Sequence, residues 1–149
     1  MKQVFADSVF WIAVIRPDDP YEQSALEALD SIGQARLITT EEVLTELCAA
    51  VSRSDSLLRR KTQIVRRLWA SENVRVIAQS HDSFLAGLEL YEKRADKWYS
   101  LTDCISMNTM LREGVSEVLT NDHHFRQEGF RILMKGRSEP GGLSAPPGR

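Results

Sequence analysis

Four acidic residues stand where the sequence could gather them around one metal ion: Asp7, Glu46, Asp103 and Asp122. Asp7 and Asp122 each follow a short apolar run that is typical of a buried strand, whereas Glu46 and Asp103 lie in longer patterns typical of helices. Carboxylates brought together repel one another, and a hard divalent cation relieves that repulsion. Mg²⁺ prefers oxygen ligands and needs only one or two direct carboxylates plus a phosphate oxygen.

The chemistry that such a site favours is metal-dependent hydrolysis of a phosphodiester. The sequence shows no glycine-rich phosphate-binding loop and no placed nucleophile that would favour another reaction. Each acid also has a structural alternative. Asp7, Asp103 and Asp122 stand near helix starts, where a capping carboxylate contributes ~0.5–2 kcal/mol. Glu46 lies about 40° outside the apolar stripe of its helix, so its alternative is a salt bridge to an arginine.

Short apolar runs alternate with longer helical patterns, which fixes how these acids are positioned. The expected strands are 4–6, 36–39, 74–77, 117–120 and 130–134, and the expected helices are 8–16, 21–32, 40–51, 54–70, 81–93 and 101–112. This alternation predicts a three-layer α/β/α domain with a central, mainly parallel sheet of four to five strands. Ligands bind at the carboxyl ends of such strands, so the acids after the first and fourth strands are expected to meet.

Four segments resemble the PIN-domain ribonucleases, and most of all the stand-alone bacterial PIN proteins related to VapC-type toxins. They are VFADSVFWIA, TTEEVLTEL, SLTDCISM and VLTNDHHFRQEGF, and the resemblance spans about residues 4–133. It implies an endoribonuclease that depends on Mg²⁺ or Mn²⁺. By motif position Asp7 and Asp103 become direct metal ligands, while Glu46 and Asp122 hold ligands, waters or a second ion.

The resemblance also implies the surroundings and partners of this pocket. Ser8, Thr102 and Thr120 are expected to complete it, and Asn121 stands where relatives carry another polar or acidic side chain. The implied reaction is in-line attack of an activated water on an RNA phosphate. The implied partners are the RNA substrate, a second copy of the chain in a homodimer, and an antitoxin in a type II toxin–antitoxin pair.

Charged and aromatic residues before the Asp103 helix have two interpretations each. Arg94 and Lys97 are candidate contacts to substrate phosphates. Asp96 is a candidate fifth acid, with a surface salt bridge as the favoured alternative. Trp98 and Tyr99 could stack on a base, but packing at the helix start explains both residues and is the prediction.

His123 and His124 are expected to contact substrate or solvent, because neighbours on a helix point about 100° apart and cannot easily share one ion. Cys48 and Cys104 have no metal-ligand spacing and are predicted to be small buried apolar residues.

Composition and charge place the chain among globular proteins. It has 149 residues, 42% of them hydrophobic and 27% charged, with a net charge of −2. We expect one domain over residues 1–135 and a disordered tail over 136–149, with no signal peptide or membrane span and a cytoplasmic location. The helix over 54–70 concentrates arginine, which is compatible with nucleic-acid binding and equally with a solvated face.

Two other functions remain open on the sequence. A catalytically silent PIN protein would bind RNA or a protein through the same scaffold. A phosphatase-like metal hydrolase would share the aspartate after the first strand but commonly needs a second aspartate two residues on, where this chain has Val9.

Overall fold

The computed structural model describes residues 1–50 and 55–136 and contains a single five-stranded parallel sheet. Its order is β3-β2-β1-β4-β5. The strands are β1 (Gln3–Ala6), β2 (Arg36–Thr40), β3 (Val74–Ile77), β4 (Glu117–Leu119) and β5 (Arg131–Ile132). The prediction of a three-layer α/β/α domain with a parallel sheet is confirmed.

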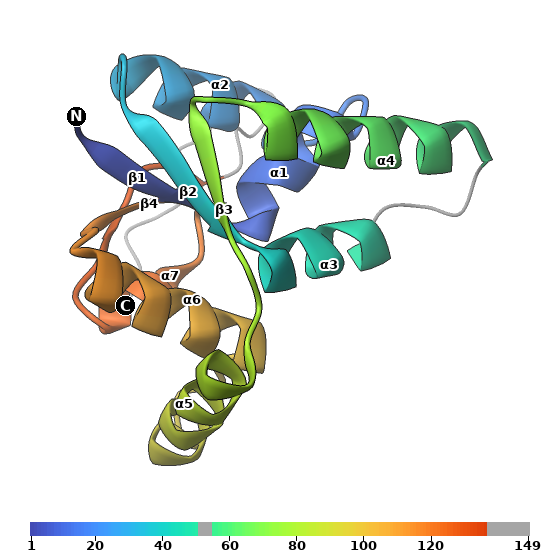
Figure 1. Ribbon diagram of the computed structural model, residues 1–149. Coiled ribbons are helices and arrows are strands. Elements are labelled where there is room, and N and C mark those ends of the chain that lie inside the picture. The colour runs from blue at the N-terminus through green and yellow to red at the C-terminus, as the bar shows by residue number, and fades with distance from the viewer. Residues whose placement is uncertain (51–54, 137–149) are drawn as a thin grey trace.

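Seven helices connect and flank these strands within the described residues (Figure 1). They are α1 (Ser8–Ile15), α2 (Glu22–Ser31), α3 (Glu41–Ala50), α4 (Asp55–Ala70), α5 (His81–Lys93), α6 (Leu101–Glu113) and α7 (His123–Gln127). Figure 1 shows α1, α2 and α4 on one side of the sheet and α5, α6 and α7 on the other.

The strand order places a topological switch point between β1 and β4. The chain runs outward from β1 through β2 to β3, then returns to place β4 and β5 on the other side of β1. Because crossovers between parallel strands are right-handed, this reversal sends the helices after β1 and β4 to opposite faces of the sheet. In open α/β sheets, ligands bind beyond the carboxyl ends of the strands at such a switch point.

The core centres on β1, the middle strand. Val4, Phe5 and Ala6 are fully buried, as expected for a strand covered on both faces. Phe5 is in register with Ile38 of β2 and with Val118 of β4, and both of these residues are fully buried too. This packing holds the residue after β1 at a fixed place on the edge of the sheet.

The structure corrects the predicted buried face of α2. The helical spacing of the sequence places Ala25, Leu26, Leu29 and Ile32 on one face, but Leu26 and Leu29 are exposed, and the helix buries Ser24, Ala25 and Ala28. Small side chains let this helix approach the rest of the chain closely, and the Ser24 hydroxyl donates to the Lys135 carbonyl at 2.9 Å.

The C-terminal part of the domain also differs from expectation. β5 is shorter than the predicted strand over 130–134, and the helix start expected at Asp122 is that of the short helix α7. The predicted tail lies outside the described residues from residue 137 onward. In the described ranges, no helix combines the length and the apolar character needed to cross a lipid bilayer.

Candidate functional site

Asp7 lies at the switch point, buried at the carboxyl end of β1. Its side chain is only 2% exposed, and its backbone amide donates to the Leu119 carbonyl at the end of β4. The Thr120 hydroxyl donates to Oδ2 at 2.9 Å, whereas Oδ1 is buried without a hydrogen-bond partner among the described residues. Asp7 holds the N-cap position of α1 without a side-chain capping bond, so capping does not explain this carboxylate.

Two of the acids have raised pKa values because they are buried beside other negative charges. Burial raises the pKa of Asp7 from 3.8 to about 7, and the negative charges of Asp103 and, more weakly, Glu46 add to the rise. Burial also raises the pKa of Asp103, with further contributions from Asp122 and Glu46. The four acids separated in the sequence therefore lie close enough to interact, as the parallel sheet predicted.

Glu46 is hydrogen bonded directly to the first residue of α1, which follows β1. The Thr40 hydroxyl accepts the Val43 amide at 3.1 Å, which caps α3 and sets the direction in which this helix leaves β2. Glu46 is half-buried on α3 and accepts a hydrogen bond from the Ser8 hydroxyl, next to Asp7. Across residues 1–50 and 55–136 Glu46 forms no ion pair, so the arginine salt bridge is not seen there.

Asp103 and Asp122 cap helices and also face the pocket. The Ser100 hydroxyl accepts the Asp103 amide at 3.0 Å, and the Ser100 amide donates to Asp103 Oδ2 at 3.1 Å, a reciprocal capping box at the start of α6. Asp122 Oδ1 accepts the His124 amide at 2.9 Å at the start of α7. For these two residues the capping interpretation is confirmed, and their role in a metal pocket stays a prediction.

His124 joins this cluster, which the sequence argument did not anticipate. Its Nδ1 lies 3.6 Å from Asp103 Oδ2 and 3.3 Å from Asp122 Oδ1. One ligand atom from each of these three residues lies within 4.8 Å of the others. His123 is exposed, so the expectation that the two histidines do not act together agrees with the structure. The signal for His124 was its place two residues after the acid that follows β4.

The donor set fits a divalent cation. Among the described residues Asp7 Oδ1 is a buried acceptor without a donor; the charges of Asp103 and Glu46 act on this carboxyl, and that of Asp122 acts on Asp103. Carboxylate oxygens suit Mg²⁺ and Mn²⁺, and the His124 imidazole adds one nitrogen donor at the side of Asp103 and Asp122. A cation would give Asp7 Oδ1 the partner it lacks and offset the charge repulsion.

The other pocket residues predicted from the sequence differ in how directly they contact the acids. Thr120 is fully buried; besides donating to Asp7, its hydroxyl accepts the Asp122 amide at 3.2 Å. Thr102 lines a cavity of about 390 Å³ that Glu46 also lines. Asn121 is half-buried beside Asp122.

The charged residues before α6 lie at the surface. Arg94 Nε donates to Glu128 Oε1 at 2.7 Å. The exposed Asp96 and Lys97 side chains lie 4.0 Å apart. Asp96 is thus a surface residue beside a lysine, which agrees with the favoured alternative to a fifth pocket acid.

Two packing predictions are wrong and two are confirmed. Trp98 is 87% exposed and has a φ of 62°, so it does not pack at the helix start, whereas Tyr99 is buried. Cys48 is exposed while Cys104 is buried. Leu47 is the last buried residue of α3, and Cys48 begins its exposed end and lines a cavity beside α4.

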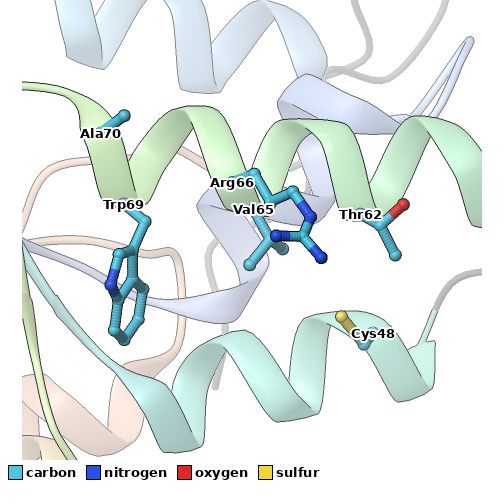
Figure 2. Close-up of a pocket in the computed structure, with 6 residues that line it drawn as sticks. All are labelled: Cys48, Thr62, Val65, Arg66, Trp69 and Ala70. Atoms are coloured by element: carbon cyan, nitrogen blue, oxygen red, sulfur yellow. The ribbon is translucent and has the colours of Figure 1, made fainter.

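A separate cavity of about 540 Å³ lies between α3 and α4 (Figure 2). It is lined by Cys48, Thr62, Val65, Arg66, Trp69 and Ala70, and none of the four acids takes part in it. On α4, four arginine side chains are exposed: Arg59, Arg60, Arg66 and Arg67. The buried Lys61 of the same helix donates to the Cys48 carbonyl at 3.0 Å. The basic face of α4 is therefore solvent-accessible, and its binding of nucleic acid stays a prediction.

Comparison with known proteins gives one family and a set of similar folds. A family model described as the PIN domain matches residues 4–130. A sequence search among curated proteins gave no match. The crystal structure of Mycobacterium tuberculosis VapC20, described as a sarcin–ricin loop cleaving toxin, has a TM-score of 0.76 at 23% identity and covers 85% of this chain and 95% of its own.

Two further solved structures have similar folds. DNA-bound VapBC from Salmonella typhimurium has a TM-score of 0.62 at 16% identity and covers 89% of this chain and 97% of its own. FitAcB from Neisseria gonorrhoeae has a TM-score of 0.62 at 16% identity and covers 87% and 96%. At these identities the likeness extends to the fold.

Proposed function

The chain belongs to the PIN-domain family, and from this premise we propose that it is a metal-dependent endoribonuclease. The observation that carries the proposal is the buried, unpartnered Oδ1 of Asp7 within a group of four interacting carboxylates. Such a group is costly to bury unless a cation occupies it. It lies at the switch point between β1 and β4, the position where open α/β sheets bind their ligands.

The proposed roles follow from the contacts of each residue. When bound, Mg²⁺ or Mn²⁺ supplies charge neutralisation for an RNA phosphate and lowers the pKa of a water molecule. Asp7 and Asp103 are the proposed direct ligands, with Glu46 and Asp122 holding ligands, waters or a second ion. Thr120 fixes the orientation of Asp7 through its 2.9 Å hydrogen bond. Ser8 fixes Glu46 in the same way.

We also infer a regulatory partner of the antitoxin kind and assembly as a homodimer. The resemblance to VapC-type toxins and the fold shared with VapC20, which is described as a toxin, support the first inference. An arginine from an antitoxin segment would suit the acidic pocket, because a guanidinium pairs with carboxylates through two parallel hydrogen bonds and replaces the cation.

Cleavage of single-stranded RNA tests the proposal. The wild-type protein should cleave RNA with Mg²⁺ or Mn²⁺ and stop when a chelator is added. Asp7→Asn and Asp103→Asn should each lose at least about 100-fold in rate, since each removes a charge that holds the cation. The matched control is Asp96→Asn, an exposed acid outside the pocket, which should cleave like the wild type.

Thermal unfolding separates the enzyme from the silent binding module. Metal binding to the folded state alone stabilises it by about 2.7 kcal/mol at a concentration of 100 times the dissociation constant. We expect millimolar Mg²⁺ or Mn²⁺ to raise the melting temperature of the wild type and of Asp96→Asn but not of Asp7→Asn. An RNA-binding protein with no metal-induced rise and no cleavage would be the silent module.

A further inference from the structure

The segment between α5 and α6 presents a tryptophan to solvent. Trp98 is 87% exposed, and among the described residues only Met1 is a more exposed large apolar side chain. Its φ of 62° lies in the left-handed region, which bulky residues rarely adopt. Neither feature contributes to folding, because an exposed indole buries no area and a left-handed backbone adds strain. Together they hold an aromatic face out from the surface.

Trp98 forms one side of an aromatic cleft. The cleft has a volume of about 580 Å³, within the range of small-molecule sites, and its lining includes Tyr91, Arg94, Trp98 and Tyr99. Two of these lining side chains are held in place by hydrogen bonds to one carboxylate oxygen. Arg94 Nε and the Tyr99 hydroxyl donate to Glu128 Oε1 at 2.7 and 3.0 Å.

The cleft shares a wall with the acidic pocket. Ser100 lines the cleft and also caps α6 through its two hydrogen bonds with Asp103. The Tyr99 ring lies 5.1 Å from the His124 ring, and His124 Nδ1 lies 3.6 Å from Asp103 Oδ2. An RNA strand with a phosphate at the acids would therefore bring the neighbouring nucleotide toward the aromatic side chains.

These aromatic groups match an unpaired nucleobase. The bases of single-stranded RNA stack on the planes of tryptophan, tyrosine and arginine side chains, and this stacking does not require a positively charged surface. In a duplex, both faces of a base are covered by its stacked neighbours. The segment 89–97 holds acidic and basic residues in equal number, so flat surfaces rather than charge distinguish this cleft. A base also requires a polar rim, which Arg94 and Ser100 provide.

We propose that the cleft of Tyr91, Arg94, Trp98 and Tyr99 binds an unpaired RNA base next to the scissile phosphate, with Trp98 as the stacking face. This inference rests on the proposed ribonuclease function. It makes Trp98 a determinant of substrate binding rather than of the chemical step. Substrates whose bases are unpaired at the cleavage point are then cleaved in preference to duplexes.

Substitution of Trp98 tests the proposal on the full-length protein. Trp98→Ala should raise KM for a single-stranded oligonucleotide about 10-fold or more with little change in kcat, since one base–aromatic stack is lost. Trp98→Phe should recover most of the loss. The matched control, Leu111→Ala, removes another exposed apolar side chain at the far end of α6 and should change neither value.

An abasic RNA shows whether Trp98 acts through a base. Binding is measured in the Asp7→Asn background, which keeps the RNA intact. Removing the base beside the cleavage position should weaken binding when Trp98 is present and have no further effect in Trp98→Ala. Independent effects of the two changes would overturn the proposal.

The outcomes separate the cleft from the active site. Metal-dependent cleavage with equal KM values for wild type and Trp98→Ala would overturn the stacking proposal alone and leave the cleft to a protein partner. Absence of cleavage and of RNA binding in the folded wild type would overturn both proposals.

Discussion

At the scale of single residues, the buried carboxyl of Asp7 is the group that connects stability with chemistry. Its Oδ2 accepts from Thr120 while Oδ1 is without a donor among the described residues, so ionisation leaves a buried charge only half satisfied. The raised pKa of Asp7, about 7, reflects this position. Without metal, the folded protein disfavours the charged form of this carboxyl, so its ionisation should lower the free energy of unfolding.

The pH dependence of unfolding in a chelator should therefore differ between the wild type and Asp7→Asn. The folded pKa of Asp7 is raised from 3.8 to about 7. Between these pH values the folded state binds more protons than the unfolded state, so wild-type stability should fall as pH rises through that window. The fall attributable to Asp7 is on the order of 4 kcal/mol, at about 1.4 kcal/mol per pH unit.

Asp7→Asn should lack this component. The free energy of unfolding of the variant minus that of the wild type should therefore be larger at pH 8 than at pH 4. Denaturant unfolding at several pH values measures the difference. Asp96→Asn, at an exposed acid, should follow the wild type. Parallel curves for the wild type and Asp7→Asn would contradict the assignment.

At the scale of elements, local signals predicted positions well and tertiary contacts poorly. Helices α5 and α6 begin at the predicted residues, where Ser80 and Ser100 each form a capping box with the first turn. The acids converged because parallel strands share one carboxyl edge. His124 was missed because its contact with Asp103 joins two separate elements, and helical spacing carries no information about such a contact.

The exposed face of α2 and the exposure of Trp98 illustrate the same limit. Leu26 and Leu29 fit an apolar stripe, yet α2 packs through small residues, which depends on how closely its neighbours approach. Trp98 was expected to pack because it is apolar, but a left-handed backbone turns it outward. The spacing of apolar residues in the sequence predicts neither the exposure of Leu26 and Leu29 nor that of Trp98.

The contact between α5 and α6 depends on a glycine and gives a prediction at this scale. A Cβ added at Gly87 would lie 2.4 Å from Ile105 Cγ1, which is closer than real contacts. Gly87→Ala should destabilise the protein by about 1–3 kcal/mol through overpacking, less the ~1 kcal/mol that alanine contributes to a helix.

A double-mutant cycle with Ile105→Ala supplies the control. Because that change removes Cγ1, the double variant should be more stable than the sum of the two single effects predicts. Chemical denaturation measures all four proteins. Simple additivity would mean that Ile105 moves aside without cost.

At the scale of the whole molecule, charge is separated between an acidic pocket and a basic helix. The net charge of −2 conceals the exposed arginines of α4, which lies beside α3, the helix that carries Glu46 (Figure 1). A nuclease whose catalytic pocket is negative needs positive charge elsewhere to attract a polyanion. The exposed face of α4 is a candidate for that role.

The salt dependence of RNA binding tests this role. In the Asp7→Asn background, replacing Arg59, Arg60 and Arg66 with glutamine should weaken binding and flatten the slope of log K against log salt. The slope should change by up to about 2, at roughly 0.7 per lost phosphate contact on a single strand. Arg112→Gln and Arg131→Gln are controls outside α4, and an unchanged slope in the triple variant would make α4 a solvated face.

The central position of β1 also governs when the site can exist during synthesis. Asp7 and Thr120 are 113 positions apart, yet their side chains are hydrogen bonded because β1 pairs with β4. Asp122 follows two residues later. While the polypeptide is growing on the ribosome, its first acid emerges long before the strand that completes its surroundings. Whatever reaction this centre performs can begin only when translation of the domain is nearly finished.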